Sequence, residues 1–120
     1  MKKTTFMRKR EDMLYTMASE SHGGKGVLDW TKVIASDETK DKHLKCFFDL
    51  VLQPDVSIGI HMHENDEEYY YLISGTGIMT LDEERVEVGP GDITAVFPGG
   101  THGLENNSGT DLRVLVISVC

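Results

Sequence analysis

The sequence of 120 residues contains only two cysteines and three prolines, and it has no long apolar run. Cys46 and Cys120 lie far apart and form no C-x-x-C pair, which argues against a disulfide framework and is typical of a reducing compartment. No segment approaches the roughly 18 apolar residues that a membrane span needs. The first fifteen residues are basic but lack the apolar core of a signal peptide. We therefore expect a cytoplasmic protein with no membrane partner.

Basic residues are also scarce, because 12 Lys and Arg stand against 20 Asp and Glu and give a net charge of −8. A surface of this sign repels nucleic acid and anionic lipids, so neither is an expected partner. An anionic ligand would need a local positive charge, such as a metal ion. The sequence contains no G-x-S-x-G nucleophile motif, and the glycine-rich residues 21–26 lack the spacing of a phosphate-binding loop. We expect those residues to form a flexible loop.

The chain from Leu44 onward is rich in β-prone segments that end at turn residues, and it has no long helical period. The expected strands are residues 44–52, 56–63, 67–74, 93–100 and 111–119, with a hairpin at 77–89 folded around Asp82, Glu83 and Glu84. Several short strands without helices predict an all-β sandwich or barrel. Residues 10–20 are expected to form either a short helical turn or an irregular arm.

The length is that of a single domain with a hydrophobic core of its own. Within it, we expect an N-terminal arm with the first strands over residues 1–35, followed by the barrel over residues 36–120. The neighbourhood of two closely spaced histidines is the part of that barrel that indicates chemistry.

His61 and His63 are two residues apart, so strand alternation places both imidazoles on one face with Met62 on the other. The same alternation predicts that Ile60 shares the opposite, apolar face with Val56 and Ile58. Two imidazoles on adjacent positions of one face can bind a single metal ion.

A carboxylate and a third imidazole can reach the same place. Glu68 begins the next expected strand after a short loop, and His102 follows 34 residues later in a loop after another strand. Glu67 is an alternative to Glu68, because alternation lets only one of the two point inward. Spacing to His63 favours Glu68. Imidazoles combined with a carboxylate suit a divalent transition metal.

Residues 59–77 resemble the first cupin motif, which is His-x-His, four residues, Glu, six residues and Gly. Its positions are taken here by His61, His63, Glu68 and Gly75. Residues 91–106 are similar to the second cupin motif, whose positions are taken by Gly91, Pro98, Gly100, His102 and Asn106. This second motif departs from the usual spacing, with one residue instead of two before His102 and six instead of five before Pro98.

The resemblance implies a cupin double-stranded β-helix, a jelly-roll barrel with a short irregular N-terminal arm. It further implies one divalent transition metal per chain, held by His61, His63, Glu68 and His102. Manganese or iron is favoured, and zinc and nickel are alternatives. Exposed strand edges favour pairing with a second chain. Because cupins commonly dimerise through their sheets, we expect a homodimer in which residues near the N-terminus cross to the partner.

The small oxalate decarboxylase-like cupins are the subset that the chain resembles most. One expected function is therefore a metal-dependent enzyme acting on a small carboxylate. The other is a non-catalytic, metal-containing binding or sensor protein, with a cupin dioxygenase or isomerase as a further alternative. Tyr70 shares the face of Glu68 and is the candidate proton donor, although barrel packing explains it equally well. His22 lies in a His-Gly-Gly loop and is either a residue at the pocket rim or an exposed loop histidine.

Overall fold

The computed structural model of the protein describes residues 4–40 and 42–120, and strands dominate it. In chain order the strands are β1 (Leu14–Ser19), β2 (Val27–Ala35), β3 (Leu44–Leu52), β4 (Ser57–Met62), β5 (Glu67–Ser74), β6 (Gly77–Leu81), β7 (Glu84–Val88), β8 (Ile93–Val96), β9 (Thr101–Glu105) and β10 (Leu112–Val119). Short 3-10 turns are η1 (Arg10–Asp12), η2 (Ser21–Gly23) and η3 (Ser36–Glu38). Among the described residues, no helix has the length and apolar character to cross a membrane.

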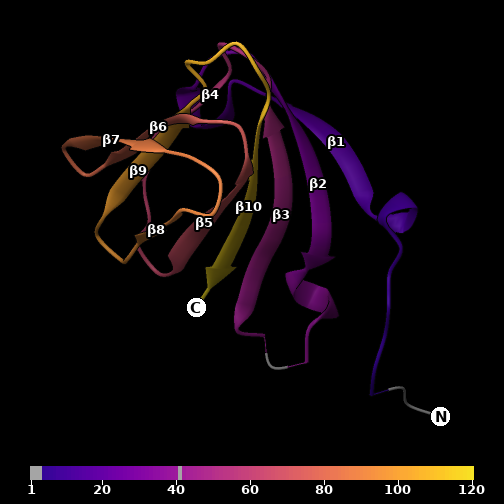
Figure 1. Ribbon diagram of the computed structural model, residues 1–120. Helices are drawn as coiled ribbons and strands as arrows, with labels where there is room; N and C mark the ends of the chain where they lie inside the picture. Colours follow the sequence, from indigo (N-terminus) through magenta and orange to yellow (C-terminus); the bar gives the residue numbers. More distant parts are fainter. Residues whose placement is uncertain (1–3, 41) are drawn as a thin grey trace.

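The strands form two antiparallel sheets. One has the order β1-β2-β3-β10-β5-β8 and the other the order β4-β9-β6-β7. In Figure 1, β1, β2, β3 and β10 lie side by side, and the strands of the smaller sheet cross on the left. The last strand, β10, is inserted between β3 and β5, so the sheets are joined by long crossovers as in a jelly roll. The all-β prediction is confirmed.

The hydrophobic core lies between the inner faces of the two sheets. Strand β10 shows the alternation that builds it, because Leu112, Val114 and Val116 are almost fully buried while Arg113 points outward. Both sheets contribute aliphatic side chains to one cluster, which includes Leu50, Leu52, Ile58, Leu72, Met79 and Leu104. These side chains fill the interior between the two sheets. The candidate site lies beside this core.

The predicted hairpin over residues 77–89 is confirmed, with β6 and β7 paired from Gly77 and Val88 to Leu81 and Glu84. The N-terminal segment differs from the expectation. Arg10–Asp12 form a helical turn, but Leu14–Ser19 form strand β1 and not an irregular arm. The strand pairs with β2 along its whole length, a long-range contact that the local sequence does not reveal.

The prediction that Ile60 lies on the buried face of β4 is wrong. Ile58 is 4% exposed, whereas Ile60 is 61% exposed. The pairing of β4 with β9 shifts register between Ile58 and His61, so Gly59 and Ile60 on β4 lie opposite the single residue Gly103 on β9. This β-bulge reverses the inside and outside positions from that point on. It is the reason that His61, and not Ile60, follows Ile58 into the barrel.

A buried carboxylate on the outer face of the larger sheet connects three parts of the chain. Asp49 of β3 is 3% exposed and accepts two hydrogen bonds from Arg113 of β10, with Oδ to Nε and Nη2 distances of 3.0 and 2.7 Å. It also accepts one from Arg10 Nη1 at 2.5 Å. Burial alone would raise the pKa of Asp49, but the two guanidinium groups outweigh it and lower that pKa.

Candidate metal centre

Four side chains converge at one end of the barrel. His61 lies on β4, His63 directly after it, Glu68 on β5 and His102 on β9. Their ligand atoms all lie within 4.8 Å of one another, and His61 and His102 are directly paired across β4 and β9. The sequence prediction that these four residues meet is confirmed, including His102 with its shortened motif spacing. The larger sheet contributes Glu68 and the smaller sheet the histidines.

The distances within this cluster fit a common metal ion. His102 Nε2 lies 3.1 Å and His63 Nε2 3.3 Å from Glu68 Oε1, and the two Nε2 atoms are 3.1 Å apart. Neighbouring donors on an ion with bonds of about 2.1 Å are about 3.0 Å apart in an octahedron and about 3.4 Å apart in a tetrahedron. Three nitrogens and one carboxylate oxygen at these separations could hold a divalent transition metal.

The second ring nitrogens of two histidines are fixed by acceptors outside the cluster. His61 Nδ1 donates to the carbonyl oxygen of Gly59 at 2.8 Å, and His63 Nδ1 donates to Asp66 Oδ1 at 2.9 Å. Each bond places the proton on Nδ1 and leaves Nε2 with a free lone pair, as metal binding requires. Asp66 also pairs with Lys45 at 3.1 Å. Sequence reasoning missed Asp66, and its place three residues after His63 is the signal that could have identified it.

Glu68, and not Glu67, faces the cluster. Its Oε2 accepts a hydrogen bond from Ser118, which leaves Oε1 directed at the histidines, whereas Glu67 accepts one from the Tyr69 hydroxyl. Burial would raise the pKa of Glu68, but hydrogen bonds from His102 and Ser118 and the nearby imidazoles lower it. Glu68 is therefore an ionised ligand candidate whose second oxygen is oriented by a neighbour.

Burial favours the neutral form of the His61 imidazole. It lowers the pKa of His61 to about 4, with the neighbouring imidazoles adding to the effect. His102 has no exposed surface, and its Nδ1 has no hydrogen-bond partner among the described residues. Neutral imidazoles are the form that binds a metal.

Tyr70 is 3% exposed and packs in the core with its ring centroid 4.7 Å from that of His102. Burial raises the pKa of its hydroxyl well above 10, and the charge of Glu68 and a hydrogen bond to it add to the effect. Tyr70 belongs to the hydrophobic core, as barrel packing predicts, and it also lines a cavity beside Glu68.

His22 stacks on His61, with ring centroids 3.6 Å apart and planes within 9° of parallel. His22 is exposed in its loop and also lies at the rim of the site, so the two alternatives that the sequence left open do not exclude each other. Burial lowers the pKa of its imidazole, and the neighbouring His63 and His102 act in the same direction while Glu68 opposes them.

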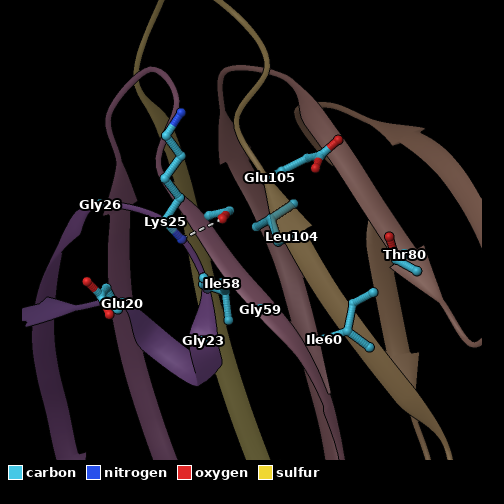
Figure 2. Close-up of a pocket in the computed structure, with 12 residues that line it drawn as sticks. Glu20, Gly23, Lys25, Gly26, Ile58, Gly59, Ile60, Thr80, Leu104 and Glu105 are labelled. Atoms are coloured by element: carbon cyan, nitrogen blue, oxygen red, sulfur yellow. Dashed lines mark hydrogen bonds between the residues drawn. The ribbon is translucent and has the colours of Figure 1, made fainter.

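A cavity of about 50 Å³ lies next to the cluster. It is bounded by Glu68 and His22 on the polar side, and its other walls include Trp30, Phe48, Leu50, Ile58, Tyr70 and Val116. On the outer side of the loop that carries His22 is a surface groove. Figure 2 shows this groove, with Gly23 and Gly26 of the loop on one side and Ile60 and Thr80 on the other. The sequence pattern did not indicate Trp30 as part of the site, because β2 reaches it only through sheet pairing.

The protein is a double-stranded β-helix that carries a cluster of potential metal ligands, and a comparison with known protein families identifies the same kind of protein. Residues 48–118 match the model of the cupin domain family. The chain therefore belongs to the cupin family. It is 30% identical over 101 residues to a protein of Thermotoga maritima named oxalate-binding protein, covering 84% of this chain and 83% of that one.

Solved structures share the fold. A Thermotoga maritima protein described as a predicted oxalate decarboxylase superposes with a TM-score of 0.90 at 25% identity, covering 95% of this chain and 98% of the other. A polyketide cyclase of Streptomyces resistomycificus superposes with a TM-score of 0.77 at 24% identity, covering 98% of this chain and 80% of that one. The second likeness concerns the fold alone. The first supports assignment to the small oxalate decarboxylase-like cupins.

Proposed function

We propose that each chain binds one divalent transition metal ion through His61, His63, Glu68 and His102. The observation that carries the proposal is the set of donor separations of 3.1 to 3.3 Å between His63, His102 and Glu68, with free Nε2 atoms aimed at one point. Manganese or iron is the proposed ion, and zinc and nickel are alternatives. Four protein donors leave two positions of an octahedral ion for a ligand.

The proposed ligand is a small carboxylate such as oxalate. Three neutral imidazoles and one carboxylate leave a divalent ion with a net positive charge, which attracts an anion despite the overall charge of −8. The named function of the Thermotoga maritima relative as an oxalate-binding protein supports this ligand class. The cavity of about 50 Å³ beside Glu68 accepts only a compact molecule.

The proposed reaction is decarboxylation. In hydrogen oxalate the C–C bond breaks, carbon dioxide leaves, and the electron pair left on the other carbon takes up a proton to give formate. When bound, the ion would hold the carboxylate and stabilise negative charge that develops on it. Tyr70 is the proposed proton donor, because its raised pKa keeps the hydroxyl protonated next to Glu68. The cavity beside Tyr70 is lined mostly by apolar side chains.

One experiment tests both the metal and the reaction. Untagged protein, purified without chelator, and a His61→Ala/His63→Ala variant are analysed for metal by elemental mass spectrometry. The manganese-loaded samples are then incubated with oxalate, and formate is measured. We expect near-stoichiometric metal and formate production in the parent and neither in the variant. A parent that takes up no metal after reconstitution would refute the ligand assignment. In a Tyr70→Phe variant we expect oxalate binding without formate.

The cavity also supports binding without turnover as a second candidate. Among the described residues that line it, Glu68 is the only carboxylate, and it is already committed to the cluster. A sensor or carrier needs no further acid. In this case the parent would bind oxalate in calorimetry and produce no formate.

We also propose that the protein is cytoplasmic and that the N-terminal part ends and the barrel begins at residue 35. The free thiols of the two cysteines support the cytoplasmic location.

We further propose a homodimer. The outer face of the larger sheet supports it, because the paired residues Tyr71 and Ile93 expose 42% and 63% of their surface there. Exposed Phe6 and Met7 of the N-terminal segment suit a role in crossing to the partner.

A further inference from the structure

The loop of residues 20–26, called the His22 loop, is fixed against the start of β4. Ser57 N donates to Lys25 O at 2.8 Å, and Lys25 N donates to Ser57 Oγ at 2.8 Å. A side chain on Gly59 would meet the carbonyl oxygen of His22 at 2.0 Å, so glycine is required for the loop to approach so closely. The loop is thus held by β4, the strand that carries His61.

His22 has a backbone conformation that this contact imposes. Its φ is 51°, in the left-handed region that few residues other than glycine and asparagine occupy at small cost. The backbone thereby aims the imidazole back over His61, where it stacks at 3.6 Å. His22 is not one of the four clustered donors, and its ring has no hydrogen bond to another described residue. Its ring nitrogens are available to a ligand.

A second unused donor borders the same cavity. The Trp30 Nε1 atom is buried and has no hydrogen-bond partner among the described residues. The Trp30 ring packs edge-on against Phe48 at 4.7 Å, and both rings line the cavity between β2 and Glu68. A buried N–H without an acceptor is unfavourable unless a ligand or water pairs with it.

We propose that His22 and Trp30 form a subsite that binds the second carboxylate group of the ligand, which is the group that does not bind the metal. The inference rests on the proposed function, in which the first carboxylate group of the ligand binds the ion. An imidazole N–H and an indole N–H are the donors that a carboxylate accepts from, and the surrounding aliphatic walls strengthen such bonds. The ligand class is then a compact dicarboxylate in which two carboxylates are directly joined. His22 and Trp30 act as positioning residues and determine specificity.

The test measures binding of oxalate and formate to manganese-loaded protein by calorimetry, with quenching of Trp30, the single tryptophan, as a second readout in the parent. Formate has one carboxylate and cannot use the subsite. We expect Trp30→Phe and His22→Ala to weaken oxalate binding at least tenfold and to leave formate binding and manganese content unchanged. His22→Asn, which keeps a donor and tolerates the left-handed backbone, should recover part of the affinity. His43→Asn, which changes a histidine that does not belong to the cluster, is the matched control.

The outcomes separate the subsite from the proposed function. If the manganese-loaded parent does not bind oxalate, both are overturned. If the parent binds oxalate and the variants bind it within twofold of the parent, the proposed function stands and the subsite is overturned. Equal weakening of oxalate and formate would also overturn it, because that result indicates damage to the metal site. A further comparison uses only the parent protein, so its result does not depend on whether a variant folds. We expect its affinity to fall at least tenfold from oxalate to malonate, and equal affinities would refute the subsite.

Discussion

At the scale of single residues, the candidate metal ligands are oriented by side chains that do not belong to the cluster. His63 depends on Asp66, and Glu68 depends on Ser118. A hydrogen bond to the outer nitrogen of a metal-binding histidine fixes its tautomer and raises its basicity. Such neighbours are therefore expected to control metal affinity although they do not touch the ion.

Asp66→Ala is expected to lower manganese affinity by about 10- to 100-fold, because His63 loses the acceptor that holds its proton on Nδ1. Asp66→Asn keeps an acceptor oxygen without the charge, so its affinity should lie between those of the parent and the alanine variant. Competition with a fluorescent chelator gives the affinities. Asp111→Ala, which removes an exposed carboxylate, is the control. Parent-like affinity in Asp66→Ala would show that the bond to His63 does not matter for binding.

The cluster itself was predictable from the sequence, because motif spacing does not depend on the details of the strands. Its surroundings were not. The contacts of His22 and Trp30 depend on where β2 and the His22 loop lie against β4, which only the folded chain determines. Tyr70 was found by alternation, since β5 has no register shift between Glu68 and Tyr71 in its pairing with β8.

At the scale of elements, the bulge in β4 shows where alternation fails. The prediction for Ile60 assumed a regular strand, and one extra residue after Ile58 reversed it. The pair His61 and His63 was still predicted correctly, because both residues follow the bulge. Strand β1 was missed for a different reason, since its side chains remain largely exposed and it gains order by pairing with β2.

The Asp49 network gives a pH-dependent contribution to the stability of the larger sheet. The pKa of Asp49 is lowered in the folded state, so its contribution is complete above the unfolded value of about 3.9 and is lost as pH falls through the folded value. Asp49→Asn should lower the free energy of unfolding by about 2 kcal/mol at neutral pH, because Arg10 and Arg113 lose a charged acceptor. Since both arginines are partly exposed, a larger loss is not expected.

Urea denaturation of the parent and of Asp49→Asn measures this contribution. The difference between the two should be constant from neutral pH to about pH 5 and should shrink below about pH 4. Asp55→Asn, in an exposed turn, is the control. A difference between the parent and Asp49→Asn that does not change with pH would contradict the assignment.

At the scale of the whole molecule, the outer face of the larger sheet is the proposed dimer surface. A Tyr71→Glu/Ile93→Glu variant places two charges on neighbouring positions of β5 and β8, and we expect it to be monomeric. Light scattering should give the mass of two chains for the parent and of one for the variant. Ile60→Glu/Met62→Glu charges the exposed side of β4 in the other sheet and should leave the dimer intact. A parent that stays monomeric at all concentrations would contradict the proposal.

The position of the cluster between the sheets has a consequence for the motions of the barrel. Glu68 belongs to the larger sheet and His61 and His102 to the smaller one, so a bound ion would tie the sheets together at one end. Mass action then raises the free energy of local opening of these strands. Manganese should slow exchange of the backbone amide hydrogens of β4, β5 and β9 and leave those of β1 unchanged, as mass spectrometry of deuterated peptides can measure. If manganese protected every strand equally, the ion would not act as a local cross-link. The metal-free protein would then open no more readily at the end of the cluster than elsewhere.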